Sequence, residues 1–543
     1  MNSNDGLPNG TDGEPSPRQM QTRAMSSFVA VVREPGRYLS NDSESDKSES
    51  VRISPLTDLP LPSVAKTAMS ELDEVFSRAR TTQVQWERLP ISSRAKLLRT
   101  FESLMWKYQE QILDVIQWET GKPRKHAFEE ILDVSQNIGF VTGKGPSILR
   151  DRATSGAVPI LSRATVSHHP IGVIGVIAPW NYPFTLAISD ACAALLAGNS
   201  VVLKPASQTP LCAIMVCSLL QRAGLAPGVF QLVLGPGKTA GESVARQADY
   251  VMFTGSTKVG SHIAELCGSR LIGFSGELGG KNPSVVFSDA DLKKWAETAK
   301  RECFSNSGQL CVSIERIFIH ESVWDRALSL LIEAVATLRP GRNFQWTTDF
   351  GPLVDSAQFD RVNKQIDDAI SKGATVLTGG RPLPELGPTG YCPTLLTNVT
   401  EEMQLYSEET FGPIVALYPW SNQHQMVNKV NNSAYGLNGS VWSSDRSNAI
   451  RVAGRLQVGS VSINEGYGAT WGSVTAPIGG FKSSGVGRRH GPEGLLKYTE
   501  TQTVTTGPKS LDPWLGMSAR TWAEIEGALV RGRNLLWRLT SRA

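Results

Sequence analysis

The 543-residue sequence lacks long apolar stretches, and this absence argues against a membrane span. No uninterrupted apolar run reaches the roughly 18 residues that a membrane-spanning helix needs. The N-terminus also lacks the apolar segment of a signal peptide. The seven cysteines are an odd number without the spacing of a disulfide framework, which indicates a reducing compartment. We therefore expect a cytoplasmic protein.

An excess of one charge sign is absent as well. The sequence holds 54 Lys and Arg residues against 51 Asp and Glu residues, which gives a formal net charge of +3. Such a balance provides no broad basic surface, so we expect no nucleic-acid partner. We predict no metal site either.

Hydrophobic patterns divide the chain into regions, and its length predicts two or three domains. Residues 1–50 are rich in Ser, Asn, Asp, Gly and Pro and predict a disordered tail. From Ala65 to about Thr120, apolar residues recur with helical spacing. From Ile171 onward, short β-branched runs alternate with helical segments. This alternation is typical of a parallel sheet covered by helices, and therefore of the α/β class.

Two glycine-rich segments carry the residues best suited to chemistry. Cys311 ends the segment 304–311, and Glu277 lies in the segment 276–281. A cysteine thiolate can attack a carbonyl carbon, and a nearby carboxylate can activate first the thiol and then a water molecule. The alternatives are a small buried cysteine and a structural carboxylate in a turn.

Both segments resemble the signature sequences of the aldehyde dehydrogenase superfamily. The matching motifs are Gly-Gln-Leu-Cys at 308–311 and Glu-Leu-Gly-Gly-Lys at 277–281. The resemblance covers about residues 55–507. Within the superfamily, segments 121–130 and 487–500 look most like the branch of NADP-dependent succinate-semialdehyde dehydrogenases.

The resemblance implies a Rossmann-type cofactor domain, an α/β catalytic domain and a small oligomerisation hairpin, assembled into a homodimer or homotetramer. The expected domain boundaries are 51–150 with 170–276 for the cofactor domain, 277–489 for the catalytic domain, and 151–169 with 490–508 for the hairpin.

The resemblance also implies NAD(P)-dependent oxidation of an aldehyde to a carboxylic acid. Cys311 would form a thiohemiacetal and then a thioester, and Glu277 would activate the hydrolytic water. Asn181 would hold the negative oxygen together with the Cys311 backbone amide. Two alternatives are transfer of the acyl group to coenzyme A and a catalytically silent structural relative.

Further residues are expected to bind the cofactor. By the same resemblance, Lys204 contacts the adenosine ribose and Glu409 the nicotinamide ribose. The turn from a strand into a helix at residues 253–260 offers free amides to a pyrophosphate. Ser207 occupies the position at which NAD-preferring relatives carry glutamate, so we expect NADP to be preferred and NAD to be accepted. The other predicted cofactor-binding residues are Trp180, Gly255, Ser256, Gly260, Leu278 and Phe411.

Two departures from the family pattern concern charge. Asp190 and Arg489 reverse the signs that many relatives have at these positions, which predicts either a structural ion pair or a proton relay. Ser189 stands where relatives that oxidise succinate semialdehyde commonly place an arginine for the distal carboxylate. An aromatic pocket would favour an apolar aldehyde instead. The predicted pocket residues are Tyr182, Tyr467 and Trp471.

The last segment, residues 509–543, has an amphipathic pattern. Apolar residues recur at steps of three and four from Trp522 to Leu539, and arginines add positive charge. The stripe predicts either packing on this protein or its partner subunit, or peripheral attachment to an acidic membrane surface. The arginines are Arg531, Arg533, Arg538 and Arg542.

Overall fold

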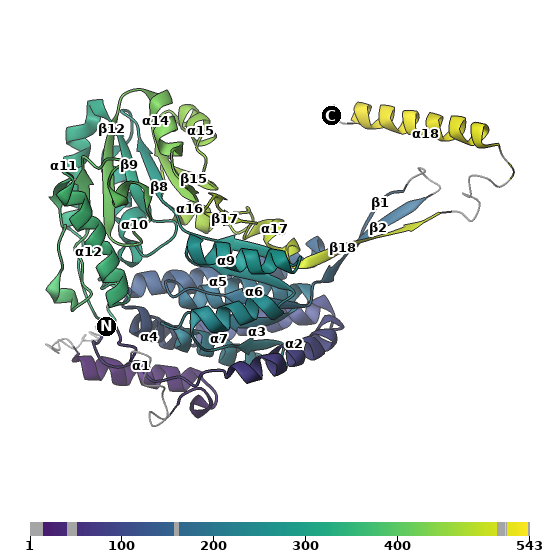
Figure 1. Cartoon of the computed structure of the whole chain (residues 1–543), viewed down its shortest axis with the longest axis horizontal. Coiled ribbons are helices and arrows are strands. Elements are labelled where there is room, and N and C mark those ends of the chain that lie inside the picture. The colour runs from purple at the N-terminus through teal and green to yellow at the C-terminus, as the bar shows by residue number, and fades with distance from the viewer. Residues whose placement is uncertain (1–14, 41–50, 157–161, 508–515, 517, 541–543) are drawn as a thin grey trace, which may run out of the picture.

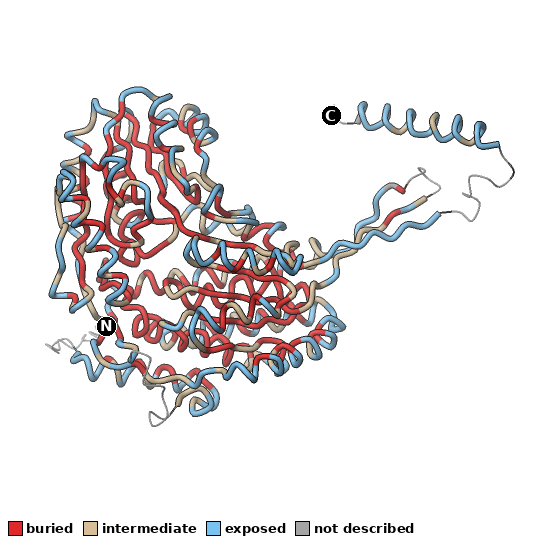
Figure 2. Tube along the Cα trace, in the orientation of Figure 1, coloured by how far each residue is buried: buried red, intermediate tan, exposed pale blue. Residues whose placement is uncertain are grey.

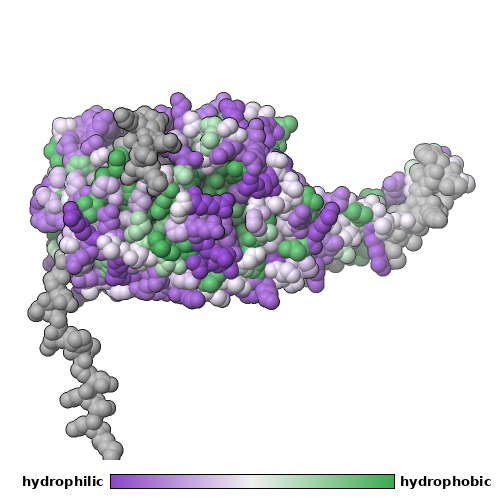
Figure 3. Space-filling model, turned by 90° about the horizontal axis from the view of Figure 1, so that it is seen from below, coloured by the Kyte–Doolittle hydropathy of each residue, from purple (hydrophilic) through white to green (hydrophobic). Residues whose placement is uncertain are grey.

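The structure, a computed structural model, describes residues 15–40, 51–156, 162–507, 516 and 518–540. Two helix-covered sheets make up the body, and a narrow three-stranded arm extends from it (Figure 1). Within these ranges no helix is both long enough and apolar enough to cross a membrane. The face shown in Figure 3 mixes hydrophilic and hydrophobic residues.

The first sheet has six strands in the order β17-β7-β6-β3-β4-β5, and only the β17–β7 pair is antiparallel. Alternate residues of its strands enter two different cores. Val173 and Ile177 of β3 face one layer of helices, whereas Ile174 and Val176 face the other. The strands are β3 (Val173–Ile177), β4 (Ser200–Lys204), β5 (Phe230–Leu232), β6 (Tyr250–Thr254), β7 (Gly273–Glu277) and β17 (Gly485–Val486).

Helices cover both faces of this sheet. Helices α2, α8 and α9 share a core with one face, and α3 to α7 share a core with the other. Their bounds are α2 (Leu72–Glu87), α3 (Ile91–Lys107), α4 (Gln109–Thr120), α5 (Arg124–Ile148), α6 (Pro183–Ala197), α7 (Pro210–Arg222), α8 (Glu242–Gln247) and α9 (Thr257–Ser269).

The second sheet has seven strands in the order β10-β11-β12-β9-β8-β14-β15, and only β10 is antiparallel to its neighbour. Its strands are β8 (Asn282–Val286), β9 (Ile314–His320), β10 (Thr375–Thr378), β11 (Thr394–Thr397), β12 (Ile414–Trp420), β14 (Asn438–Trp442) and β15 (Ser460–Ile463). Both sheets are largely parallel and helix-covered, so the predicted α/β class is confirmed.

Helices α10 and α11 cover one face of the second sheet, and α12 to α15 cover the other. These helices are α10 (Leu292–Phe304), α11 (Trp324–Ala336), α12 (Ser356–Ser371), α13 (Gln404–Ser407), α14 (Gln423–Asn431) and α15 (Arg446–Ala453). Between and after them lie β13 (Tyr435–Gly436), α16 (Gly468–Trp471), β16 (Phe481–Lys482) and α17 (Gly491–Leu496).

A short segment joins the two sheets. Strand β7 ends at Glu277 and β8 begins at Asn282, so residues 278–281 carry the chain from the first sheet into the second. Ligands of parallel α/β sheets bind beyond the carboxyl ends of the strands. The end of β7 therefore lies where both halves of the body can contribute to one site.

The arm is a separate antiparallel sheet with the order β1-β2-β18. Its strands are β1 (Arg152–Ser155), β2 (Arg163–Pro170) and β18 (Thr499–Thr506). They fall in the segments for which an oligomerisation hairpin is expected, except that β2 runs one residue beyond 169. Figure 2 shows β18 as exposed along its length, in contrast with the buried strands of the body. An exposed edge strand offers unpaired backbone groups to another chain.

The prediction of a disordered tail over residues 1–50 is wrong for one segment. This segment forms helix α1 (Pro17–Val31), whose apolar face is buried against α4 and α7, with Phe28 fully buried. Apolar residues spaced along one helix face can be buried even where the average composition is polar. Residues 1–14 and 41–50 of the predicted tail lie outside the described residues.

The amphipathic C-terminal segment contains helix α18 (Ala519–Thr540). Its apolar residues stay in contact with solvent: Ile525, Leu529 and Leu536 are 41%, 43% and 61% exposed. Figure 2 shows the helix in the colours of exposed and partly exposed residues. The apolar stripe is therefore not covered by the body of its own subunit.

Candidate active site

A cavity that opens to solvent is lined by residues of both halves of the body. Of the predicted site residues, Lys204, Ser207, Gly260 and Tyr467 are not part of this lining. The predicted residues that line it are Trp180, Asn181, Tyr182, Gly255, Ser256, Glu277, Leu278, Cys311, Glu409, Phe411 and Trp471.

The backbone before Cys311 is strained. Asn306, Ser307 and Gly308 adopt left-handed conformations with φ angles of 50°, 56° and 72°. For non-glycine residues such conformations cost on the order of 1–3 kcal/mol each, so contacts elsewhere must stabilise them. At Gly308 a Cβ atom would lie 2.1 Å from the carbonyl oxygen of Gly412, so a larger residue does not fit.

Hydrogen bonds hold this loop in place. Nδ1 of His126 accepts the backbone N–H of Asn306 at 3.1 Å, and burial lowers the pKa of His126 well below its ordinary value. The Asn306 side chain donates to the carbonyl oxygen of Asn181 at 3.2 Å, and the Ser307 hydroxyl donates to a backbone carbonyl at 2.7 Å. These contacts fix the position of Cys311. Sequence reasoning missed His126, which lies on α5 within a segment that resembles the family.

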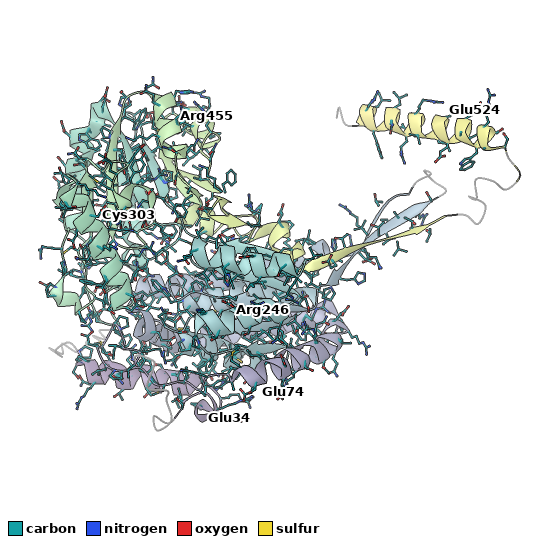
Figure 4. All side chains as sticks on the ribbon, viewed as in Figure 1. Glu34, Glu74, Arg246, Cys303, Arg455 and Glu524 are labelled. Atoms are coloured by element: carbon teal, nitrogen blue, oxygen red, sulfur yellow. The ribbon has the colours of Figure 1, made fainter. Side chains whose placement is uncertain are left out.

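Cys311 is partly exposed, whereas the other six cysteines are buried, and all seven are free thiols. Cys303, labelled in Figure 4, lies in the core beside the second sheet and is 1% exposed. Burial, together with the charge of Glu277, raises the pKa of Cys311 to about 12. The thiol is therefore protonated at neutral pH and needs a base before it can attack.

Glu277 ends β7, directly before the segment that joins the two sheets. Burial raises the pKa of its carboxyl to about 7, and the cations Arg489 and Lys497 oppose that rise. A group with this pKa exchanges protons near neutral pH, as a general base must. The predicted base and the predicted nucleophile, Cys311, thus lie in one cavity.

Asn181 precedes α6 and is 4% exposed at the cavity wall. Its side-chain amide donates one hydrogen bond, at 3.2 Å, to the carbonyl oxygen of Gln309. The amide has a second N–H, which can bind an oxygen atom next to Cys311. The flanking residues Trp180 and Tyr182 also line the cavity.

Lys204 ends β4 and is buried. Its ammonium has no hydrogen-bond or ion-pair partner among the residues that the structure describes, and burial lowers its pKa to about 8. A buried cation without a partner is unfavourable, so this position fits an anionic or strongly polar ligand. The nearby Ser207 is neutral, and its hydroxyl donates to the carbonyl oxygen of Gly235 at 3.2 Å.

Helix α9 begins at the cavity. Ser256 caps it by accepting the backbone N–H of Val259 at 3.4 Å, and Gly255 precedes it. The free amides of the first turn suit the oxygens of a phosphate. A Cβ at Gly260 would lie 2.4 Å from Leu278, so glycine lets this helix pack closely against the joining segment.

Glu409 closes the other side of the cavity. Its carboxylate accepts the backbone N–H of Gly280 at 2.8 Å, and burial raises its pKa to about 7. Glu315 accepts the backbone N–H of Phe411 at 2.9 Å and bonds to Lys281 at 2.6 Å in a buried ion pair. This pair fastens the loop of Glu409 and Phe411 to the second sheet. Sequence reasoning missed Glu315, although Lys281 belongs to the signature motif.

The residues present fit a nicotinamide dinucleotide. The start of α9 offers amides to the pyrophosphate, and Lys204 offers a cation that has no partner among the described residues. Glu409 offers a carboxylate to a ribose. A Cβ at Gly279 would lie 2.8 Å from that carboxylate, so glycine leaves the space beside it open.

The predicted ion pair between Asp190 and Arg489 is confirmed. Asp190 also accepts hydrogen bonds from the Lys497 ammonium and the Tyr498 hydroxyl, each at 3.1 Å. Burial alone would raise the pKa of Asp190, but Arg489 and Lys497 lower it below its ordinary value. Sequence reasoning missed Lys497 and Tyr498, because only the fold brings the end of α17 next to α6.

Tyr467 lies behind the cavity wall. Its hydroxyl donates to Glu129 at 3.1 Å and accepts a hydrogen bond from the Ser305 hydroxyl at 2.9 Å, and the residue is not part of the cavity lining. The Tyr182 hydroxyl donates to the same carboxylate of Glu129 at 3.2 Å, and Arg301 bonds to it at 2.8 Å. Sequence reasoning missed Glu129 as the residue that organises this wall.

Ser189 belongs to an internal polar network. Its hydroxyl donates to the buried carboxylate of Asp133 at 2.8 Å, and the hydroxyl of Thr185 bonds to the same carboxylate. The position at which some relatives carry an arginine therefore supplies no cation to the cavity.

Known proteins resemble the chain over most of its length. The sequence profile of the aldehyde dehydrogenase family matches residues 41–504. A relative from Mycobacterium tuberculosis (strain H37Rv), "Putative succinate-semialdehyde dehydrogenase [NADP(+)] 2", is 44% identical over 88% of this chain and 91% of its own length. "Betaine aldehyde dehydrogenase" from Bacillus subtilis is 32% identical over 87% of this chain and 96% of its own.

Solved structures agree in fold. An "E. coli NADP dependent enzyme" superimposes with a TM-score of 0.82 at 32% identity and covers 88% of this chain and 99% of its own. An "Indole-3-acetaldehyde Dehydrogenase in complexed with NAD+" has a TM-score of 0.82 at 30% identity, covering 91% and 100%. The family profile, these relatives and the shared fold show that the chain belongs to the aldehyde dehydrogenase family and is an NAD(P)-dependent enzyme that oxidises aldehydes.

Proposed function

We propose that Cys311, Glu277 and Asn181 are the catalytic residues of this oxidation. The observation that supports this proposal most directly is that the three side chains, from distant segments, line one cavity. Because burial raises the pKa of Cys311 to about 12 and that of Glu277 to about 7, the carboxylate is the group available to accept the thiol proton.

In the first step Glu277 accepts the thiol proton, and the sulfur of Cys311 forms a bond to the carbonyl carbon. The carbonyl oxygen becomes negative and is stabilised by the Asn181 amide and the Cys311 backbone N–H. A donor of this kind contributes about 2.7–4 kcal/mol in comparable sites. When bound, the nicotinamide cofactor supplies the acceptor for the hydride that leaves this adduct, which becomes a thioester.

In the second step Glu277, having lost its first proton to solvent, takes a proton from water. The water oxygen attacks the thioester carbon, the carbon–sulfur bond breaks, and the carboxylic acid leaves. A base for water favours hydrolysis over transfer of the acyl group to coenzyme A. The presence of all three residues in one cavity also favours catalysis over a silent structural role.

NADP is the proposed preferred cofactor, and NAD is accepted. Lys204 supplies a buried cation without a partner in the described residues, and Ser207 brings no negative charge near it. A 2′-phosphate on the adenosine ribose is the group that distinguishes NADP from NAD. This arrangement would attract that phosphate, whereas a glutamate at 207 would repel it.

The proposed substrate is an aldehyde with a neutral, largely apolar tail. Aromatic and aliphatic side chains line the cavity near the nucleophile. Two cations near its wall have carboxylate partners, because Arg489 bonds to Asp190 and Arg301 bonds to Glu129. A third, Arg361 in the lining, donates to the backbone carbonyl oxygen of Glu409. Ser189 adds no charge. A substrate carboxylate would therefore have to compete for Arg489 with Asp190 and for Arg361 with the Glu409 carbonyl oxygen, which disfavours it against a neutral tail.

The proposed assembly is a homodimer or homotetramer in the cytoplasm, formed through the arm of β1, β2 and β18. The exposed length of β18 supports this, since an edge strand can pair with another chain. The proposed division into domains follows the expected boundaries, with residues 277–489 as the catalytic part and 51–150 with 170–276 as the cofactor part.

Helix α18 is proposed to attach the protein peripherally to an acidic membrane surface. Ile525, Leu529 and Leu536 form an exposed apolar stripe. The acidic residues of the helix lie in its first half, whereas its second half carries arginines. Each basic residue near an acidic membrane contributes about 1 kcal/mol. The second-half arginines within the helix are Arg531, Arg533 and Arg538.

We predict that Cys311→Ala lowers aldehyde-dependent reduction of NADP by at least about 1,000-fold, because the covalent step requires the sulfur. Binding of NADP, measured by fluorescence titration, should be retained. Cys303→Ala is the matched control, since that thiol is buried in a core, and it should keep most of the activity. Turnover of Cys311→Ala within tenfold of the parent would remove this cysteine from the mechanism.

Replacement of Ser207 by glutamate should lower kcat/KM for NADP at least about fivefold, because a like charge near the 2′-phosphate costs about 1 kcal/mol or more. The value for NAD should be unchanged or higher. Ser207→Gln controls for side-chain size and should keep the preference for NADP. A parent enzyme at least ten times more efficient with NAD than with NADP would contradict the proposal.

Pentanal should give a kcat/KM at least about tenfold above that of succinate semialdehyde, which has a similar length but carries a carboxylate. A tenfold ratio corresponds to about 1.4 kcal/mol, a small part of the cost of burying an unpaired carboxylate. The comparison requires only the parent enzyme, saturating NADP and the two aldehydes. Equal efficiencies, or a preference for succinate semialdehyde, would refute the neutral-tail proposal.

Deletion of residues 511–543 should abolish co-sedimentation with vesicles that contain phosphatidylserine, while activity and thermal stability stay unchanged. Phosphatidylcholine vesicles are the control for charge and should bind the parent weakly. If the deletion instead lowers the oligomeric state or the Tm, the stripe packs on a partner subunit. If nothing changes, both interpretations of the helix are wrong.

A further inference from the structure

The carboxylate of Asp190 organises a group of buried donors next to the cavity. It bonds to Arg489 and accepts hydrogen bonds from Lys497 and Tyr498 at 3.1 Å. Arg489 is 6% exposed. The two partners of its ion pair lie on packed elements, Asp190 on α6 and Arg489 in the segment after β17. Its guanidinium therefore has little freedom to move away.

Arg489 also faces the cavity, in the same corner as Glu277. Its guanidinium donates to the Thr254 hydroxyl at 3.2 Å, and Thr254 is the residue paired with Glu277 across strands β6 and β7. Strand β17 pairs with β7 at Gly485 opposite Glu277, only a few residues before Arg489. Two neighbouring strands thus bring the arginine to the base.

One donor of this guanidinium is still available. Nε of Arg489 is buried without a hydrogen-bond partner in the described part of the chain. A buried donor left unpaired costs about 1–3 kcal/mol, more for a charged group. The site gains this energy when a carboxylate or another anion approaches Nε, and Glu277 lines the same cavity as Arg489.

The charged groups around Glu277 come from several elements. Among these charges Arg489 has the largest effect, and it favours the ionised carboxylate. Lys497, after α17, and Arg488, the residue before Arg489, act in the same direction. Asp190 on α6 opposes ionisation. Cys311, which lines the same cavity, is protonated until the base acts.

We propose that Arg489 is a positioning residue, a fixed counter-charge that keeps Glu277 ionised in its buried site. The proposal rests on the proposed role of Glu277 as the base. An arginine does not release its proton, so this residue cannot belong to a proton relay. The reversed pair therefore does more than join two elements: its permanent cation lines the cavity together with the base, whereas its carboxylate is not part of the lining.

The sign of the effect follows from these charges. Loss of the Arg489 cation should raise the pKa of Glu277 above about 7, so fewer molecules hold the base in its active form at pH 7. Loss of the Asp190 charge should lower that pKa. Both changes break the same ion pair, so a purely structural pair predicts similar consequences for the two variants.

The test compares kcat as a function of pH for Arg489→Gln and Asp190→Asn, with saturating pentanal and NADP. Arg489→Gln should move the acid limb of the kcat–pH profile to higher pH by about one unit. At pH values well below the pKa of Glu277, this shift lowers kcat about tenfold. Asp190→Asn should move it down. Arg489→Lys retains a charge and should keep the limb close to that of the parent.

Shifts in the same direction, or no shift in either variant, would overturn the proposal. If Arg489→Gln does not fold, Asp190→Asn decides alone, because an unchanged or raised acid limb contradicts the predicted charge effect. The outcome is distinguishable from failure of the proposed function, which would show instead as retained turnover and an unchanged acid limb of Glu277→Gln.

Discussion

Burial of ionisable groups is the constraint on which the rest of this site depends. Burial takes an ionisable group out of water and disfavours its charged form. The pKa of a buried carboxyl therefore rises, and the pKa of a buried lysine falls. Here burial brings the carboxyls of Glu277 and Glu409 to a pKa of about 7 and the ammonium of Lys204 to about 8. The pKa values of all three groups are therefore close to neutral pH, so a nearby charge decides whether each group is protonated.

The protein balances this burial with fixed ion pairs just outside the cavity. The Lys281–Glu315 pair holds the loop of Glu409, and Asp190 with Arg489 supports the corner of Glu277. Removal of one partner from a buried pair costs about 3–5 kcal/mol, since the other charge is left uncompensated. The positions of the reacting groups and the stability of the fold thus depend on the same contacts.

Sequence patterns predicted those parts of the site that lie in contiguous segments, such as the signature motifs around Cys311 and the β-branched strands of the sheets. They did not predict partners that only the fold brings together. His126 contacts the nucleophile loop from 180 residues away. The position of Tyr467 depends on hydroxyl partners that a count of aromatic residues does not reveal. Helix α1 was missed because average composition hides a single buried face.

The arm begins directly after Tyr498, a residue that contacts the ion pair of Asp190 and Arg489. Tyr498, whose hydroxyl donates to Asp190, is followed directly by β18, and its carbonyl oxygen accepts the side-chain amide of Asn199 at 2.9 Å. No flexible spacer separates the arm from this anchor. Because β18 continues directly from Tyr498, the position of this strand is tied through one residue to the hydrogen bond with Asp190. A displacement of β18 relative to the body would have to move or break that hydrogen bond.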